Sequence, residues 1–462
     1  MLGAIAVVTL LGLATGPPSS DPAAAVTPGQ MEGRPAASDL SPLQDLVDRA
    51  APGSVVIVPR GTYRGDLYLD RPLTLRAQGE VLLLGSGHGS VVRVRAGHVT
   101  IEGFTIDGQG GGDLSRDSSG IHVAAPDVTI TRSRIRNTLF GVYLRESSRT
   151  VVEDVEIVGI PGLAPGEKGS GIHLWNSDAF RVERNVIRDV RDGFYVQSSP
   201  NGVIRGNRVS DVRYGLHYMF SDNNLFEDNV FENGAAGAAL MYSRGIVFRR
   251  NQFLRNRGFA SVGLLLKVCD DVLAEDNLIA DNARGLFVEG SARDTFRRNV
   301  IAGSDAGVVL YDSVSKNRLE GNLFVGNRTP LLLIGNRTDT VFDRNYYSSN
   351  LEPDLDGDGV SDRPYNLSSV FDHFRGNVIA ADLLVDTPAA EAVALAERTF
   401  PVLRRIAVED KHPLAHPPLL PFVPLVRPEG RTANLAGLTV SAGLMIAALA
   451  GFHVFQRPAG IA

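Results

Sequence analysis

The sequence has one cysteine, Cys269, among its 462 residues, so an intrachain disulfide is excluded. It also lacks the Gly-x4-Gly-Lys-Ser/Thr segment with which many ATPases cradle nucleotide phosphates. Basic residues number 46 against 52 acidic ones and form no stripe, which argues against nucleic acid as a partner. Without disulfides the fold depends on its apolar core, and a hydrophobic content of 44 % is ample for one.

Both ends of the chain carry apolar segments. Residues 1–14 form a short apolar run, followed by prolines, serines and alanines, and this predicts a signal peptide or N-terminal anchor over residues 1–25. Residues 435–455 contain no Asp, Glu, Lys or Arg. Because about 20 apolar residues span a bilayer, a transmembrane helix is predicted at residues 434–456. The alternative is an apolar tail that docks on a partner.

A short unit that begins with glycine recurs along the chain. From Gly171 to Gly307 the glycines are separated by 22, 22, 22, 26, 22 and 22 residues. An asparagine follows each glycine from Gly171 to Gly285 by 14 residues, and Asn322 and Asn345 continue the series; it suits a turn that needs side-chain hydrogen bonds or left-handed backbone. The glycines of the series are Gly120, Gly141, Gly171, Gly193, Gly215, Gly237, Gly263, Gly285 and Gly307.

Each unit contains three apolar columns separated by turn residues, and alternation within the unit indicates strands rather than helix. This pattern predicts an all-β fold, a right-handed parallel β-helix of the pectate-lyase-like solenoid type, over residues 41–350. Leucine-rich repeats have similar periods but are disfavoured because no helical stretch occurs. A short helix after Ser41 is expected to cap the first coil. Residues 367–403 are expected to form a C-terminal helical cap, and residues 404–433 a proline-rich linker.

The informative side chains are those that point outward from the glycine-started strand. Adjacent coils lie about 4.8 Å apart and alternate strand residues about 6.7 Å apart, so neighbours in these columns can act together. Two positions after the glycine come His122, Tyr143, His173, Tyr195, His217, Ala239, Leu265 and Phe287. Four positions after it come Ala124, Arg145, Trp175, Gln197, Met219, Met241, Lys267 and Glu289.

Three of these side chains can converge on one ion. His217 and Met219 share a strand and a face, and Met241 lies one coil from Met219. Thioether and imidazole donors favour Cu(I) over Mg²⁺ or Ca²⁺. His173, two coils away, is a further candidate for a second shell or a separate site. The alternative is a docking face with adaptable methionine contacts, to which Tyr143, Trp175, Tyr195 and Gln197 are assigned.

Enzymatic activity is not expected. A polysaccharide lyase or hydrolase needs paired carboxylates or a strong base, and Glu289 is the one acidic residue in these two columns. A carbohydrate-binding or carbohydrate-active β-helix protein of the cell envelope remains the alternative, with Trp175 as its first candidate contact. A purely structural adhesin is a third reading.

The segment at residues 351–366 resembles a calcium-binding loop. Asp354, Asp356, Asp358 and Asp362 occupy positions 1, 3, 5 and 9 of an EF-hand-like pattern that has glycine at position 6. The twelfth position is Tyr365 instead of glutamate. A structural Ca²⁺ that closes the end of the β-helix is therefore predicted, with a metal-free aspartate-rich turn as the alternative.

Several segments together resemble the NosD family over roughly residues 41–418. They are YGLHYMFSD (214–222), ALMYSR (239–244), GFASVGLLLK (258–267), DLDGDGVSDRPY (354–365), ERTFPVL (397–403) and DKHP (410–413). The resemblance implies a periplasmic β-helix that works with the permease and ATPase of an ABC transporter. It further implies copper-site formation in nitrous oxide reductase, with copper supplied by a chaperone lipoprotein. The C-terminal apolar segment is not part of that pattern and predicts an anchor in the inner membrane.

Overall fold

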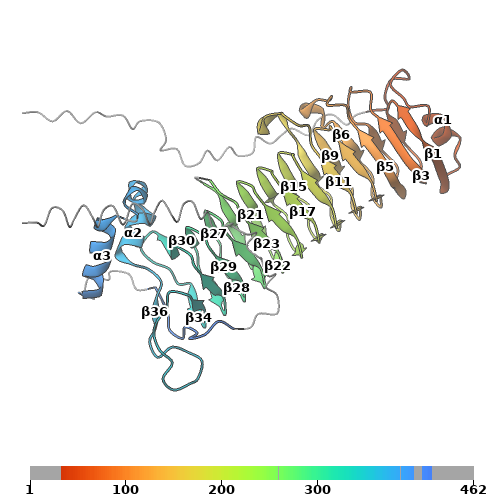
Figure 1. Cartoon of the computed structure of the whole chain (residues 1–462). Helices are drawn as coiled ribbons and strands as arrows, with labels where there is room; N and C mark the ends of the chain where they lie inside the picture. The colour runs from red at the N-terminus through yellow and green to blue at the C-terminus, as the bar shows by residue number, and fades with distance from the viewer. Residues whose placement is uncertain (1–32, 259, 386, 400–407, 419–462) are drawn as a thin grey trace, which may run out of the picture. The chain divides into compact units, whose positions relative to one another are not determined.

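The computed structural model describes residues 33–258, 260–385, 387–399 and 408–418. Within them the chain winds into a solenoid of parallel strands, with each coil stacked on the one before it (Figure 1). This confirms the all-β parallel solenoid predicted from the glycine repeat. The predicted signal peptide at residues 1–25 and transmembrane helix at residues 434–456 lie outside the described residues. None of the described helices is long and apolar enough to cross a membrane.

One face of the solenoid is a 12-stranded parallel sheet that contains the glycine-started strands. Each strand pairs with its counterpart in the next coil, so equivalent residues stand in columns. Its strands are β2 (Leu67–Leu69), β4 (Val92–Val94), β6 (Ser119–Val123), β9 (Phe140–Arg145), β12 (Ser170–Trp175), β15 (Asp192–Gln197), β18 (Tyr214–Met219), β21 (Ala236–Arg244), β24 (Val262–Asp270), β27 (Arg284–Glu289), β30 (Ala306–Tyr311) and β33 (Thr329–Ile334).

The remaining faces belong to one 25-stranded sheet, which begins with three long strands and then divides into two ladders of short ones. The long strands are β1 (Ser54–Arg64), β3 (Leu73–Leu84) and β5 (Val99–Asp107). The first ladder has β7 (Thr129–Thr131), β10 (Val151–Glu153), β13 (Arg181–Glu183), β16 (Val203–Arg205), β19 (Leu225–Glu227), β22 (Val247–Arg249), β25 (Leu273–Glu275), β28 (Thr295–Arg297), β31 (Arg318–Glu320) and β34 (Val341–Asp343). The second has β8 (Arg134–Arg136), β11 (Glu156–Val158), β14 (Val186–Arg188), β17 (Arg208–Ser210), β20 (Val230–Glu232), β23 (Gln252–Leu254), β26 (Leu278–Ala280), β29 (Val300–Ala302), β32 (Leu323–Val325) and β35 (Tyr346–Tyr347).

The repeating glycines are required by packing inside the coil. A Cβ atom on Gly193 would collide with the Val209 side chain in the core and press on the carbonyl of Gly215 in the next coil. Phe194, the next residue, is fully buried in the same core. Two consecutive residues therefore face inward at each glycine, and the residue before the glycine faces outward.

The asparagine column is a continuous hydrogen-bond ladder inside the solenoid. The backbone N–H and the Nδ2 of Asn207 both donate to Oδ1 of Asn229, at 3.0 and 2.9 Å, and Nδ2 also donates to the Val182 carbonyl at 2.9 Å. The sequence left two roles open for these asparagines, side-chain hydrogen bonding and left-handed backbone. In the structure they supply the hydrogen bonds. The left-handed backbone belongs to the preceding residue, as at Arg184 and Asp228. The ladder comprises Asn185, Asn207, Asn229, Asn251, Asn277, Asn299, Asn322 and Asn345.

A second internal column consists of serines, and Cys269 replaces one of them. The backbone N–H of Cys269 donates to Ser291 Oγ at 2.9 Å, as the serines do in their own coils. The thiol is fully buried, and burial raises its pKa to about 12. Cys269 is therefore a packed and unreactive substitute for serine.

Both ends of the solenoid are covered. At the start, α1 (Gln44–Arg49) places Leu43 and Val47 on the core. At the other end, α2 (Val370–Asn377) packs against β33, and η3 (Ile379–Leu384) and α3 (Pro388–Thr399) follow it (Figure 1). Residues 408–418 fall within the stretch expected to be a linker, yet they return to the last coil. There β37 (Glu409–Asp410) pairs with β34 and with β36 (Tyr365–Asn366).

Candidate functional site

The predicted copper donors lie together on the outer face of the 12-stranded sheet. Met219 in β18 is the direct cross-strand partner of Met241 in β21. His217 is two residues before Met219 on the same strand, and its partners are Tyr195 in one neighbouring coil and Ala239 in the other. The stacking of coils thus brings together two thioethers and an imidazole from segments 22 residues apart.

His217 contacts a buried carboxylate that lies outside the two outward columns of the repeat. Asp192, the first residue of β15, is 0 % exposed, and its Oδ2 lies 3.4 Å from Nδ1 of His217. Arg213 donates from Nε and Nη2 to the two oxygens of Asp192, at 2.9 and 2.7 Å. His217 itself is 11 % exposed at the side chain, and Met219 is 6 % exposed. Met241 is half-buried.

The electrostatics of this cluster keep Asp192 ionised. Burial alone would raise the pKa of Asp192, but the hydrogen bonds from His217 and Arg213, and attraction to both groups, lower it to about 2. Asp192 comes directly before its glycine, so it is absent from the columns two and four positions after each glycine. The outward column just before each glycine could have been found by noting that glycine itself points inward.

His173 lies away from the other donors, inside an aromatic stack. Its ring is parallel to those of Tyr143 and Tyr195, with centroids 4.3 and 4.4 Å away, and Tyr195 separates it from His217. Within the described residues neither ring nitrogen of His173 has a hydrogen-bond partner. Burial and the nearby Arg191 guanidinium lower the pKa of His173 to about 3, so its imidazole is neutral.

The predicted docking face is smaller than the sequence suggested. Tyr143 and Tyr195 are buried, so their rings offer little surface to a partner. Tyr143 packs with Phe140 in a small cluster that also includes Leu114, from the short helix η1 (Leu114–Arg116), and Ile160, from a loop between strands. Trp175 and Gln197, one coil apart, remain half-buried.

A second outer feature is a row of side chains in successive turns, which we call the apolar ladder: Phe220, Tyr242 and Val268. The first two directly follow Met219 and Met241 in sequence, and Val268 follows Lys267. These side chains are 53, 47 and 46 % exposed, and the first two stack with ring centroids 5.1 Å apart. All three have left-handed backbone, with φ of 51°, 54° and 53°. Other coils fill the same turn position with residues better suited to it, such as Asn176 and Gly290. A β-branched valine with positive φ is a strained choice that packing does not require.

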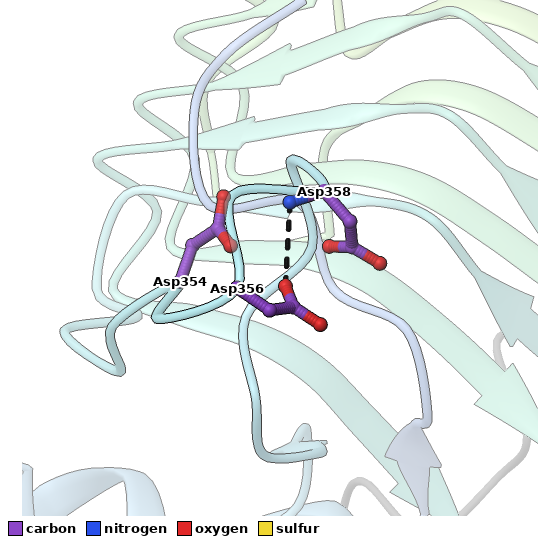
Figure 2. Close-up of side chains that lie close together, drawn as sticks. All are labelled: Asp354, Asp356 and Asp358. Atoms are coloured by element: carbon purple, nitrogen blue, oxygen red, sulfur yellow. Dashed lines mark hydrogen bonds between the residues drawn. The ribbon is translucent and has the colours of Figure 1, made fainter.

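The aspartate loop gathers three of its four predicted ligands. Carboxylate oxygens of Asp354, Asp356 and Asp358 all lie within 4.8 Å of one another, on a loop that follows β35 (Figure 2). Asp354 accepts hydrogen bonds from the backbone of Gly357 and Gly359, at 2.7 and 2.9 Å. Desolvation alone would raise the pKa of Asp354, but the hydrogen bonds from these two glycines outweigh it, and the pKa is lowered.

The other two positions of the loop have different tasks. Asp362 is outside the three-aspartate cluster, and its Oδ2 accepts a hydrogen bond from the Leu355 backbone at 2.7 Å. Tyr365, which replaces the usual bidentate glutamate, stacks on Tyr347 at the solenoid end with ring centroids 4.2 Å apart. The loop is thus built into the closure of the last coil, with three carboxylates left for a cation.

Fold and site define the chain as a parallel β-solenoid protein with a cluster of soft donors on the outside of one sheet. The NosD family, described as "Periplasmic copper-binding protein (NosD)", matches residues 156–352, which include this cluster. The "Probable ABC transporter binding protein NosD" of Stutzerimonas stutzeri is 33 % identical over 377 residues, covering 77 % of this chain and 86 % of that protein. The protein of the same name from Pseudomonas aeruginosa is 34 % identical, covering 78 % and 87 %. The chain belongs to the NosD family, as its coil segments suggested.

Solved structures support the fold alone. The A-module of a mannuronan C-5 epimerase from Azotobacter vinelandii superposes with a TM-score of 0.56 at 18 % identity, covering 66 % of this chain and 93 % of that module. At this level of identity the likeness extends to the solenoid and carries no information about chemistry.

Proposed function

We propose that this chain is a periplasmic, non-catalytic subunit that works with an ABC transporter in assembling the copper sites of nitrous oxide reductase. The names of its relatives support the transporter, and the family description supports the periplasm and copper. The role in reductase maturation rests on the resemblance of the coil segments and of the loop at residues 354–365. Its partners in this proposal are the permease, its ATPase, a copper chaperone lipoprotein and the reductase.

The observation that carries the proposal is the register of Met219 against Met241 with His217 on the same face. Two thioethers and one imidazole form a neutral, soft donor set, which selects Cu(I) over the hard divalent cations. Copper is the cargo here and passes on by ligand exchange. Three donors on an outer face, with Met241 half-buried, suit that task better than a closed cage would.

The surroundings of the donors support a non-catalytic role. Asp192 is the carboxylate nearest to His217, and both of its oxygens accept hydrogen bonds from Arg213. Because Asp192 is fully buried and engaged in this way, it is poorly placed to act as a general base toward a substrate.

The apolar ladder supports partner docking beside the donors. Exposed aromatic and apolar side chains in contiguous positions mark protein interaction sites, especially where they are retained despite backbone strain. Phe220 and Tyr242 directly follow Met219 and Met241 in sequence. A protein seated on this ladder therefore lies close enough to exchange a metal ion with the thioethers.

The proposal is tested by titrating the purified chain with Cu(I) against a chromophoric chelator under reducing conditions. We expect one ion to be taken up, and we expect the affinity to fall by at least about tenfold in Met219→Leu/Met241→Leu, which keeps the apolar bulk, and in His217→Ala. Val341→Thr, on an exposed position of the other sheet, is the matched control. Unchanged Cu(I) uptake in these variants, together with normal copper content of the reductase in cells that carry them, would refute the proposal.

We also propose that the aspartate loop binds a structural Ca²⁺. Three carboxylates at hard-cation spacing repel one another unless a cation screens them, and the loop is tied to the closing strands through Tyr365. Its role is to hold the last coil shut, separately from copper handling.

A further inference from the structure

We infer that Asp192, anchored by Arg213, is a positioning residue that keeps a proton on Nδ1 of His217 and thereby presents Nε2 as the metal ligand. This inference rests on the proposed copper site. It adds the residue that decides which nitrogen of the imidazole is available to the ion.

The chemistry of the contact fixes the direction of the hydrogen bond. An ionised carboxylate only accepts, so the imidazole nitrogen that faces it must carry the proton. Oδ2 of Asp192 lies 3.4 Å from Nδ1 of His217, the nitrogen that faces it. A neutral imidazole has one N–H, so Nε2 is left with its lone pair free for a metal.

The anchoring of Asp192 makes this contact more than a chance approach. Arg213 donates a hydrogen bond to each carboxylate oxygen, which leaves the Asp192 side chain little freedom to rotate away from His217. The imidazole plane is also fixed, because the rings of Tyr195 and Tyr214 meet it edge-on, with centroids 4.9 and 5.3 Å away. Nε2 is the ring nitrogen farther from Asp192, and Met219 lies further along the same strand, past His217.

The position of Asp192 is singular within its column. Buried carboxylates are costly unless they are paired, so their placement needs a reason. The equivalent outward position before the glycine, or its counterpart in each coil from β6 to β33, carries no other acidic residue. These residues are Ser119, Phe140, Ser170, Asp192, Tyr214, Ala236, Val262, Arg284, Ala306 and Thr329. The one carboxylate of the column stands beside the one histidine that has two methionines for neighbours.

The test compares Asp192→Asn with wild type in the full chain, using two readouts. Nitrogen chemical shifts of His217 in the metal-free protein report its tautomer, and chelator competition reports its Cu(I) affinity. The side-chain amide that this substitution introduces can donate to Nδ1, which would move the proton to Nε2. We expect the tautomer to change and Cu(I) to bind about 10- to 100-fold more weakly. Asp211→Asn, which alters an exposed carboxylate in the turn before β18, is the matched control and should change neither readout.

The outcomes separate this inference from the function it rests on. A wild-type His217 that carries its proton on Nε2 overturns the inference, even if Asp192→Asn fails to fold. A folded Asp192→Asn with normal tautomer and affinity also overturns it, while weakened binding in His217→Ala leaves the copper site standing. If His217→Ala and the methionine variants bind Cu(I) normally, the copper site itself falls, and the positioning role falls with it.

Discussion

Asp294 is a carboxylic acid at a position where the next coil has Asn317 and the preceding coil has Val272. Its backbone N–H donates to Asn317 Oδ1 at 2.8 Å, and its own Oδ1 accepts from Val272 at 2.9 Å, whereas Oδ2 is buried without a hydrogen-bond partner among the described residues. Burial, reinforced by Asp270 and Asp271, raises the pKa of Asp294 to about 8. Its neutral form therefore fits the fold, and its ionised form does not.

We predict that Asp294→Asn stabilises the protein increasingly between pH 4 and pH 8. With a folded pKa of about 8 and an unfolded pKa of about 3.9, the carboxyl favours folding fully only below about pH 4, and this contribution is lost as the pH rises. Asparagine has no such dependence, so its advantage grows to roughly 4 kcal/mol at pH 7 and levels off above pH 8. Thermal melting of both proteins at several pH values measures the difference.

Asp127→Asn, in a distant coil, is the control for this prediction, because the hydrogen bonds from Arg149 lower the pKa of Asp127. Its carboxylate stabilises the fold at pH values above the pKa that the group has in the unfolded chain. Replacing it should therefore destabilise the protein at neutral pH and have less effect in acid. If Asp294→Asn shows the same stability difference at pH 5 and at pH 9, Asp294 does not titrate in this range and the prediction is wrong.

At the scale of single residues, the periodicity was sufficient to place His217, Met219 and Met241 on one face. It could not show that Tyr143 is buried, because Leu114 and Ile160, which pack against its cluster, come from connections outside the repeat. It did not single out Asp192, because two consecutive residues face inward at each glycine and the outward positions shift by one residue there.

In the three turns of the apolar ladder, side chains that are exposed for partner binding occupy strained backbone and therefore lower the stability of the fold. We predict that Val268→Asn raises the free energy of unfolding by about 1 kcal/mol, because asparagine tolerates the left-handed backbone that valine occupies under strain. Little burial is lost, since the valine side chain is 46 % exposed. Urea midpoints measure the gain, and capture of the transporter or the reductase by the variant should weaken.

The reciprocal change is the control for the ladder. Asn176→Val places a β-branched residue at the equivalent turn, where φ is 49°, outside the ladder. It should lower stability by a similar amount and leave partner capture unchanged. A Val268→Asn protein that is no more stable than wild type would show that the turn carries no strain at that position.

The aspartate loop gives a prediction about metal removal. After treatment with EDTA, added Ca²⁺ should raise the melting temperature of the wild type, with a stabilisation of about 2.7 kcal/mol at 100 times the dissociation constant. Asp356→Asn/Asp358→Asn should abolish the shift, because it removes two of the three gathered carboxylates. Glu352→Gln, at a neighbouring acidic position outside the cluster, is the control. A shift that persists in the double variant would place the ion elsewhere.

At the scale of elements, the regular coils were predictable because each repeats the same inward columns and the same asparagine. The ends were not, because they follow no period. Glu409–Asp410 lies in a proline-rich stretch with no strand signal of its own, and it becomes β37 only because the open edge of the last coil offers hydrogen bonds.

Across the whole solenoid, the hydrogen bonds of the asparagine ladder all point in one direction. The ladder must therefore end on a group that only accepts hydrogen bonds. Each asparagine donates to the next one, so the last one, Asn345, needs an acceptor from outside the repeat. Asp410 supplies it: its Oδ2 accepts from the backbone N–H and the Nδ2 of Asn345, both at 2.9 Å, and from the Tyr347 hydroxyl at 3.2 Å. Asp410 is fully buried, and a carboxylate needs no donor beyond it.

We predict that Asp410→Ala opens the last coil and leaves the copper site intact. The change leaves the buried donors of Asn345 and Tyr347 without an acceptor, which costs about 1 to 3 kcal/mol of stability for each unsatisfied group. Because each coil of a solenoid contacts only its neighbours, hydrogen exchange should speed up in β34, β35 and β36 and stay unchanged in β15, β18 and β21. Cu(I) affinity should therefore match the wild type. Asp410→Asn, which keeps one accepting oxygen, should open the coil less. Faster exchange along the whole sheet would mean instead that the solenoid unfolds as one unit, and that its end and its metal-handling face are coupled.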